Sequence, residues 1–165
     1  MVKTNLSDVN KACLIFNHIL NKGLIRNWVR ERDEFDRRYT NISNNIISAD
    51  LHIRGNAFTP EVKIYRPKWF LTRAYATTYT GNYNYIGLNK YKLNRSIASI
   101  AGSIAHEWGH CFEYYIKTFT NHTKLNHGDN NPTGKENTFQ YWLGRSVKRY
   151  VEDNLNELLQ EVGIG

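Results

Sequence analysis

The decisive stretch of this sequence runs from Asn94 to Phe119 and reads NRSIASIAGSIAHEWGHCFEYYIKTF. Asn94 or Ser96 can cap the start of a helix, because either side chain can accept a hydrogen bond from a free backbone N–H group. The apolar residues then recur at three- and four-residue steps, as they do on one face of a helix, at positions 97, 100, 101, 104, 108, 112, 115 and 119. We therefore predict one long helix across this stretch.

A second stripe of polar residues follows the other side of the same predicted helix. Its members are Ser99, Ser103, His106, His110, Glu113 and Lys117. Two histidines four residues apart lie one helical turn from each other, so both imidazole rings can reach a single metal ion. The small residues Gly102 and Ser103 precede the pair and allow a neighbouring element to approach closely. We expect the histidine pair to face a cleft or solvent, opposite the apolar stripe.

The five residues from His106 to His110 form the pattern H-E-x-x-H. On a helix this pattern is typical of zinc-dependent peptidases, in which the two histidines bind Zn²⁺. The glutamate between them, Glu107, can act as the general base by taking a proton from a zinc-bound water. The sequence thus predicts a zinc metallopeptidase with His106 and His110 as ligands and Glu107 as the catalytic residue.

A catalytic zinc ion usually has three protein ligands, so a third ligand must come from outside the helix. His127 is our first choice, because it lies 17 residues after His110 in a predicted loop. Gly128 follows it and allows the tight backbone that a ligand loop often needs. The alternatives that stay open are His122, Glu136 and Asp129, of which Asp129 is better suited to orient a histidine ring.

Further polar residues are candidates for supporting roles near the metal. Glu113 lies one turn after His110 on the same face, where it either orients a ligand or is an ordinary surface carboxylate. A hydrogen-bond donor often stabilises the oxyanion of the reaction. The sequence does not choose among the donors Tyr85, Tyr114, Tyr141 and Arg145.

The segments before the long helix are expected to form helices, a loop and strands. Apolar residues of 7–38 recur at helical steps, with Ser7 as the cap and Gly23 either separating two helices or weakening one. Residues 39–60 are rich in Asn, Ser and Gly and predict a loop, with a short extended piece at 51–54 that contains His52.

Strand patterns follow this predicted loop. Residues 61–70 alternate as an edge strand does, with Pro67 near its end. Residues 74–89 are dense in Thr, Tyr and Ile and have a turn signal at Gly81-Asn82, so they predict a β-hairpin or two short strands. After the long helix, a polar loop leads to a C-terminal helix at about 133–162, which Gly144 splits or kinks.

These segments predict an α+β fold in one domain of 165 residues. It has N-terminal helices at about 7–38, a catalytic core at about 60–145 and a C-terminal helix at about 133–162.

The sequence resembles the zincin metallopeptidases, and within them the small SprT-like proteases and minimal zincins that some phages encode. The resemblance is carried by the strand pattern of Tyr85–Asn89, the H-E-x-x-H helix after it and His127-Gly128 beyond, over about 74–145. It implies a small mixed or antiparallel sheet packed on the active-site helix, a bound Zn²⁺ and a protein or peptide substrate. Ile116 stands where a metzincin has its third histidine, and Met1 is the sole methionine, so the metzincin subgroup is excluded.

Composition bears on partners and location. The net charge of +7 and the pI of about 9.4 favour acidic partners such as nucleic acid, or serve solubility alone. SprT-like proteases act on proteins near DNA, which the resemblance extends to this chain. The two cysteines, Cys13 and Cys111, give no disulfide framework and are expected to be free thiols.

The chain has neither a secretory signal nor an apolar run long enough for a membrane. We therefore expect a cytoplasmic protein, or one carried in a virion or acting in a host cytoplasm. Two other functions stay open: a non-catalytic or structural zinc-binding virion or accessory protein, and a zinc hydrolase of another amide, such as a cell-wall peptide stem. Glu107 argues against a purely structural site, which has no use for that carboxylate.

Overall fold

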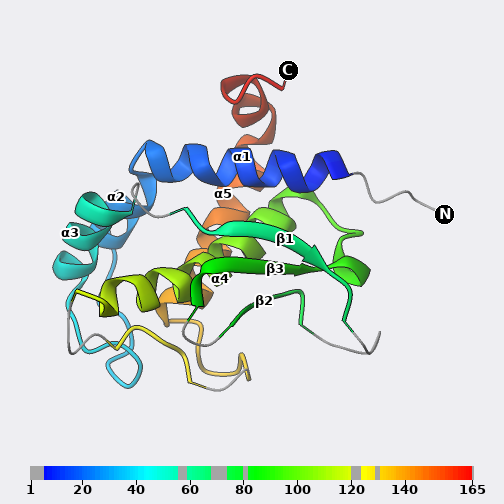
Figure 1. Cartoon of the computed structure of the whole chain (residues 1–165). Coiled ribbons are helices and arrows are strands. Elements are labelled where there is room, and N and C mark those ends of the chain that lie inside the picture. The colour runs from blue at the N-terminus through cyan, green and yellow to red at the C-terminus, as the bar shows by residue number, and fades with distance from the viewer. Residues whose placement is uncertain are drawn as a thin grey trace.

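The computed structural model describes residues 6–55, 59–67, 74–79, 82–119, 124–128 and 131–164. These residues form an α+β fold of five α-helices and a three-stranded mixed sheet (Figure 1). The helices are α1 (Leu6–Asn21), α2 (Leu24–Glu31), α3 (Asn44–Arg54), α4 (Ile97–Lys117) and α5 (Phe139–Glu161). The strands are β1 (Glu61–Tyr65), β2 (Ala76–Tyr79) and β3 (Asn82–Asn89), and a 3₁₀-helix, η1 (Lys90–Lys92), leads from β3 toward α4.

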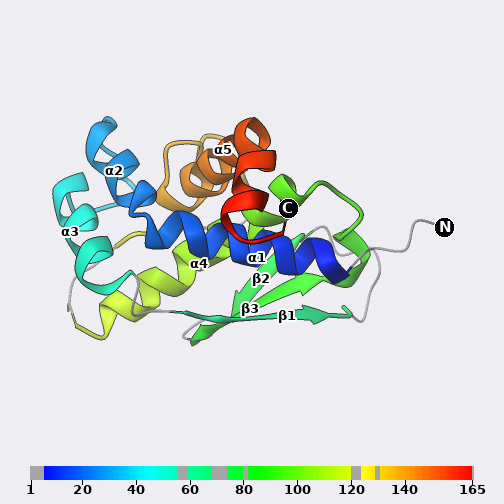
Figure 2. The same ribbon diagram turned by 90° about the horizontal axis from the view of Figure 1, so that it is seen from above.

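Helix α4 lies at the centre of the fold, with the sheet on one side and α5 on the other (Figure 1, Figure 2). The predicted apolar stripe is buried along most of its length, at Ile100, Ile104, Trp108 and Phe112. The Trp108 ring stacks on Phe112 at 4.9 Å between centroids and meets Phe16 of α1 edge-on at 5.9 Å. The last predicted member, Phe119, is 54% exposed because α4 ends at Lys117.

The start of α4 is fixed by a side-chain cap. The Ser96 hydroxyl accepts a hydrogen bond from the backbone N–H of Ser99 at 3.2 Å, so Ser96 rather than Asn94 is the N-cap. The turn before it is fixed in the same way, because the Asn89 side chain accepts a hydrogen bond from the N–H of Tyr91. These two caps connect the sheet to α4 through a short segment.

The sheet has the strand order β1-β3-β2, with β1 parallel and β2 antiparallel to β3. The antiparallel pair confirms the predicted hairpin, although Gly81 of the predicted turn lies outside the described residues. Strand β1 ends at Tyr65, two residues before Pro67, and the rest of the strand predicted over 61–70 lies outside them as well. Within the described part of the chain β2 pairs with β3 alone, so it forms one edge of the sheet.

Only one face of the sheet is covered by α4. Ile86 and Leu88 of β3 are fully buried, and Ile86 lies beside Ile104 of α4. Because side chains alternate along a strand, Tyr85 points to the opposite face. There the Lys63 ammonium lies 5.6 Å from the centre of the Tyr85 ring.

The prediction of a loop over 39–60 is wrong, because helix α3 occupies Asn44–Arg54. The helix is capped by Ser43, whose hydroxyl accepts a hydrogen bond from the N–H of Ile46. Its inner face carries Ile47 and Leu51, which are four residues apart and buried. The extended piece expected at 51–54 is therefore the last turn of a helix.

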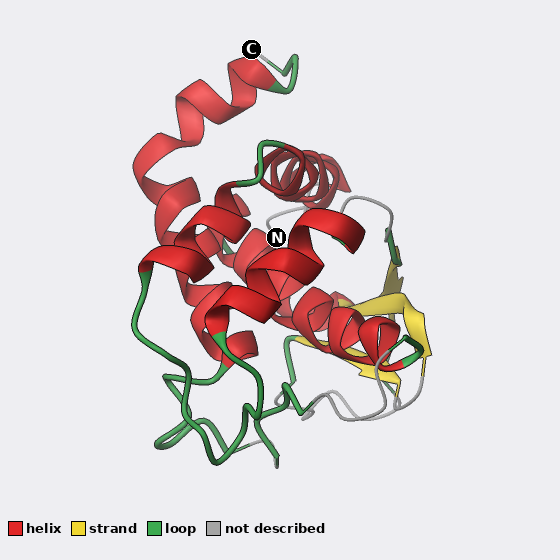
Figure 3. Cartoon of the chain, turned by 90° about the vertical axis from the view of Figure 1, so that its left-hand side faces the viewer, coloured by secondary structure: helices red, strands yellow, loops and turns green. Residues whose placement is uncertain are grey.

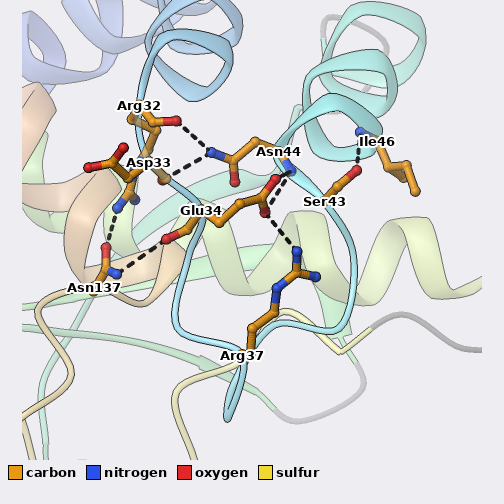
Figure 4. A network of polar contacts seen from close by, with 8 residues as sticks. All are labelled: Arg32, Asp33, Glu34, Arg37, Ser43, Asn44, Ile46 and Asn137. Carbon is orange, nitrogen blue, oxygen red and sulfur yellow. Dashed lines mark hydrogen bonds and ion pairs between the residues drawn. The ribbon is translucent and has the colours of Figure 1, made fainter.

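A network of polar contacts explains why α3 starts at an asparagine (Figure 4). The Asn44 side chain donates hydrogen bonds to the backbone carbonyls of Arg32 and Asp33, each at 3.1 Å. The Glu34 carboxylate accepts one from the Asn44 backbone N–H at 3.2 Å. Asn137, from the turn before α5, joins the same network by donating to the Glu34 carbonyl. These partners are distant in sequence, so local propensity does not predict this helix start.

The N-terminal helices predicted over 7–38 are present but end earlier, at Glu31. Gly23, with a φ of +70°, separates α1 from α2, which confirms the first of its two predicted roles. Helix α1 begins at Leu6, so Ser7 lies inside the helix and is not its N-cap. Helix α2 ends at Glu31, and a loop follows it.

Helices α4 and α5 cross in close contact at two glycines. A Cβ atom added to Gly102 would lie 2.7 Å from the Gly144 carbonyl oxygen, and one added to Gly144 would lie 2.8 Å from that of Gly102. Gly144 therefore serves close packing and neither splits nor kinks α5. The departure from helical geometry in α5 occurs at Asn154, with φ −126° and ψ 20°.

Helix α5 begins at Phe139, later than the start predicted near 133. The loops at 32–43, 124–128 and 131–138 gather at one end of the molecule (Figure 3). Asn41 and Lys124 join two of them, because the N–H of Asn41 donates to the Lys124 carbonyl at 3.1 Å. No helix in the described part of the chain is long and apolar enough to cross a membrane.

Candidate metal centre

Three histidines come together on the polar side of α4. His106 and His110 lie one turn apart on α4, and His127 reaches them from the segment 124–128. One nitrogen of each imidazole lies within 4.8 Å of the others, and the Nε2 atoms of His110 and His127 are 2.8 Å apart. Nitrogens bound to one tetrahedral Zn²⁺ at about 2.0–2.1 Å lie roughly 3.3 Å from each other. The three rings can therefore hold one metal ion after small adjustments.

The segment that carries His127 is attached to the rest of the protein at several points. Leu125 is fully buried and forms an isolated antiparallel bridge with Thr40, from the loop after α2. Asn126 donates to the Glu113 carboxylate at 3.5 Å and accepts from the N–H of Gly128 at 3.1 Å. Gly128 has a φ of +72°, which favours glycine. His127 is 3% exposed as a result.

The rival third ligands are placed differently. His122 and Asp129 lie outside the described residues. Glu136 is exposed in the turn before α5, and its backbone carbonyl accepts a hydrogen bond from Arg145. Its carboxylate does not belong to the three-histidine group found among the described residues. The structure thus brings together the three histidines that the sequence favoured as ligands, in a group that could hold a metal ion.

The local environment keeps the helical histidines neutral at pH 7. Burial lowers the pKa of His106 to about 4, with nearby His127 adding to the effect and a hydrogen bond to the Gln140 backbone carbonyl opposing it. Burial also lowers the pKa of His110 well below its usual value, and His106 and His127 contribute. Neutral imidazole is the form that binds metal ions.

Gln140 of α5 contacts two parts of the site and is not predicted from the sequence pattern. Its backbone carbonyl accepts a hydrogen bond from the His106 ring, which orients that ligand. Its side-chain amide donates to the backbone carbonyl of Leu125 in the segment that carries His127. The residue is fully buried, and the one available signal was a polar side chain between the apolar Phe139 and Trp142.

Glu107 lies on the next position of α4 after His106 and turns toward the edge strand β2. Thr78 of β2 donates hydrogen bonds to its carboxylate from both the hydroxyl and the backbone N–H. Burial nevertheless raises the pKa of Glu107 to about 7, because desolvation of the charged form outweighs these hydrogen bonds. A carboxyl group with this pKa can both accept and return a proton near neutral pH. Thr78 was not among the residues selected from the sequence.

Of the four predicted oxyanion donors, Tyr141 is the one found beside the histidines. Its ring centre lies 4.7 Å from those of His106 and of His127. Tyr85 points to the uncovered face of the sheet, and Arg145 is exposed on α5. Tyr114 is half-buried on α4, 5.5 Å from the Lys117 ammonium.

Glu113 contacts the residue before His127. It is 2% exposed, pairs with Lys117 at 2.6 Å and accepts the hydrogen bond from Asn126. Its carboxylate therefore fixes the segment that carries His127, through the neighbouring residue. This position supports the reading of Glu113 as a residue that orients a ligand over that of a surface carboxylate.

Comparison of the chain with protein-family models, with curated proteins and with solved structures finds no match.

Proposed function

We propose that this chain is a zinc-dependent metalloendopeptidase with a zincin-like fold, in which His106, His110 and His127 bind Zn²⁺ and Glu107 is the general base. The observation that carries the proposal is that the His127 ring meets the His106 and His110 rings beside α4, while Glu107 follows His106 in the chain and is held by hydrogen bonds from Thr78. A site that only stores or transports a metal has no need of such a carboxyl group.

The donor set fits a catalytic zinc better than a structural one. Structural zinc sites are closed by four protein ligands and often include cysteine. Within the described residues the group has three members, all histidines. Cys111 faces the sheet, where its thiol donates to the Tyr85 carbonyl, and Cys13 lies on α1. Three imidazoles leave one coordination position for water or substrate.

Each residue then has a definite task. Bound Zn²⁺ lowers the pKa of water to about 7 and polarises a carbonyl group. The Glu107 carboxylate accepts the proton of the attacking water and gives it to the leaving amine. Thr78 holds that carboxylate against β2, and the Gln140 carbonyl holds the His106 ring. Tyr141, whose ring lies beside those of His106 and His127, is the candidate to donate a hydrogen bond to the developing oxyanion.

The position of β2 favours a peptide over another amide as substrate. Strand β2 is an edge of the sheet, and its residue Thr78 contacts Glu107 directly. An extended peptide can pair with a free strand edge through backbone hydrogen bonds, which brings its peptide groups into line beside the strand. A peptide bound in this way would pass close to the general base.

The replacement Glu107→Gln tests the proposal. We expect it to lower kcat/KM on a mixed peptide library by about 100- to 10,000-fold, because proton transfer is lost. Zinc content should stay at one ion per chain, since Glu107 is not a ligand. Glu157→Gln, an exposed change on α5, is the matched control and should leave activity unchanged.

Two results would contradict the proposal. The first is a Glu107→Gln variant that cleaves peptides as fast as the wild type. The second is a wild-type protein that binds one zinc ion and cleaves no peptide, which would favour the alternative of a non-catalytic zinc-binding protein.

A further inference from the structure

The Arg95 side chain extends along the polar face of α4, toward residues later in the helix. It lies two residues before the first residue of the helix, yet its Nη1 donates to the Ser103 hydroxyl at 2.6 Å. The same nitrogen donates to the backbone carbonyl of Ser99 at 3.2 Å. The guanidinium carbon lies 4.8 Å from the centre of the Tyr75 ring, just before β2. The guanidinium thus sits beside the second turn of α4, on the side of β2.

This guanidinium lacks a counter-charge in the described part of the chain. Its Nε and Nη2 atoms are buried and have no hydrogen-bond partner there, and no carboxylate forms an ion pair with it. Burial lowers the pKa of Arg95, and Tyr75 opposes this effect. A half-buried cation without an anionic partner is costly in free energy. The arrangement leaves two guanidinium donors that a ligand can satisfy.

The two unpaired nitrogens of Arg95 form the edge of a guanidinium group that commonly binds carboxylates. Nε and Nη2 lie on one edge of the planar guanidinium, where their N–H groups are parallel and match the two oxygens of a carboxylate. Arg38 of this chain uses the same edge on Asp36, with Nε 3.0 Å from Oδ1 and Nη2 2.6 Å from Oδ2. The free edge of Arg95 therefore has the geometry for a carboxylate.

Arg95 is also in line with the candidate metal centre. Ser99 and Ser103 precede His106 and His110 at helical spacing, so all four lie on one side of α4. The midpoint of the two histidines lies about 7.5 Å beyond Ser103 along the helix axis, at 1.5 Å per residue. An extended peptide covers this distance in about two residues, at roughly 3.3 Å per residue.

We propose that Arg95 binds a carboxylate of the substrate about two residues from the cleaved bond, which makes acidic peptides the preferred substrate class. This inference rests on the proposed peptidase function. The carboxylate is an Asp or Glu side chain or the free C-terminus of a short substrate, since both offer the same two oxygens. Tyr75, which is 54% exposed and has its ring centre 4.8 Å from the guanidinium carbon, is the described aromatic residue beside this position.

The test uses zinc-loaded protein and peptides that differ by Glu or Gln at the second position on either side of the cleaved bond. A further pair ends there in a free or an amidated carboxyl group and so separates the two sources. The wild type should cleave the better acidic peptide about 10- to 100-fold faster in kcat/KM than its neutral partner, as for a charge-assisted hydrogen-bonded pair. Equal rates for every pair would overturn the inference without any variant, and peptide cleavage itself would still stand.

Variants locate the preference. Arg95→Gln should reduce the ratio of kcat/KM between the acidic and the neutral peptide to about one, while the neutral peptide is still cleaved. Arg95→Lys should restore part of this ratio. Arg66→Gln is the control, because Arg66 also contacts a tyrosine, Tyr91, but follows β1 at the other edge of the sheet. Tyr75→Ala should leave the preference intact. A preference that survives Arg95→Gln would overturn the assignment.

Binding separates this inference from the peptidase proposal. If no peptide is cleaved, fluorescence anisotropy of the labelled peptides on the same zinc-loaded proteins gives the answer. Tighter binding of the acidic peptide that is lost in Arg95→Gln would support the carboxylate site while the peptidase proposal fails. Absence of such a difference, or stronger Arg95-dependent binding of a single-stranded oligonucleotide, would overturn the inference.

Discussion

Burial sets the chemistry of single residues in this protein. The carboxyl group of Glu107 has a pKa raised to about 7, whereas the exposed Glu161 has a pKa lowered by its hydrogen bonds to Lys22 and His18. The two glutamates differ because one faces a strand at the edge of the core, and the other accepts hydrogen bonds from Lys22 and His18 in water. Position rather than residue type thus separates a candidate base from an ordinary surface acid.

The raised pKa of Glu107 predicts a pH-dependent effect on stability in the metal-free protein. Above pH 7 the folded chain holds a desolvated charge that the unfolded chain exposes to water, so this group destabilises the fold there. Glu107→Gln should therefore raise the free energy of unfolding at pH 8, by up to about 3 kcal/mol. The gain should shrink as the pH falls and vanish below the unfolded pKa of about 4.5.

Urea denaturation in the presence of a chelator measures this effect at several pH values. Glu157→Gln serves again as the exposed control. A gain for Glu107→Gln that is the same at pH 4 and pH 8 would show that Glu107 is not desolvated in the folded chain.

The predicted and observed sites differ where contacts depend on the fold. His106, Glu107 and His110 were recognised because their spacing is itself the signal, and His127 because a glycine follows it. Thr78 could not be found, since its contact with Glu107 depends on the register of β2, which shifts between Thr77 and Tyr79. The sequence pattern also does not tell which face of the sheet Tyr85 points to, because that depends on which face α4 covers.

At the scale of elements, the contact between α4 and α5 determines how the two halves of the site meet. Helix α4 carries two ligands, and α5 carries Tyr141 and Gln140. The glycines at the crossing let the backbones approach closely, and a Cβ atom on Gly144 would also lie 3.1 Å from the His106 Cβ atom. The crossing therefore controls where His106 stands.

Gly102→Ala should destabilise the fold by about 1–3 kcal/mol, as expected for overpacking, because the added methyl group meets the Gly144 carbonyl oxygen at 2.7 Å. The sign of this change in the free energy of unfolding is informative, because alanine in place of glycine at an unobstructed helix position stabilises the fold by about 0.5–1 kcal/mol. Urea unfolding of the zinc-free protein measures the change. A stabilised Gly102→Ala variant would contradict the close crossing.

The elements themselves were predictable to the extent that local patterns determine them. The apolar periodicity of α4 and the strand patterns of the hairpin depend on neighbours in sequence, and the helix and the antiparallel strand pair are both confirmed. Helix α3 was missed because its start depends on contacts of Asn44 with carbonyls of Arg32 and Asp33. Asparagine-rich sequence favours loops until such partners are present.

At the scale of the whole molecule, segments far apart in sequence meet at the metal centre. The loop after α2 pairs with the His127 segment through Thr40 and Leu125, so the N-terminal region takes part in holding a ligand. A metal ion bound by His106, His110 and His127 would join α4 to that segment. Binding to the folded state alone stabilises a protein by about 2.7 kcal/mol at a hundredfold excess over Kd.

Zinc removal should therefore lower the melting temperature of the wild type measurably. His127→Ala should remove most of that chelator effect, because two ligands hold zinc much less tightly than three. His52→Ala, a change of an exposed histidine on α3, is the control and should keep the full effect. A His127→Ala variant with the full chelator effect would assign the third ligand to another residue.

Zinc X-ray absorption spectroscopy of the loaded protein tests the central claim most directly, because it reports the atoms bound to the metal. We predict a first coordination shell of three imidazole nitrogens at about 2.0–2.1 Å and one or two oxygens, as expected for an open site of three histidines. Sulfur at about 2.3 Å, or a closed shell of four imidazoles, would contradict the account.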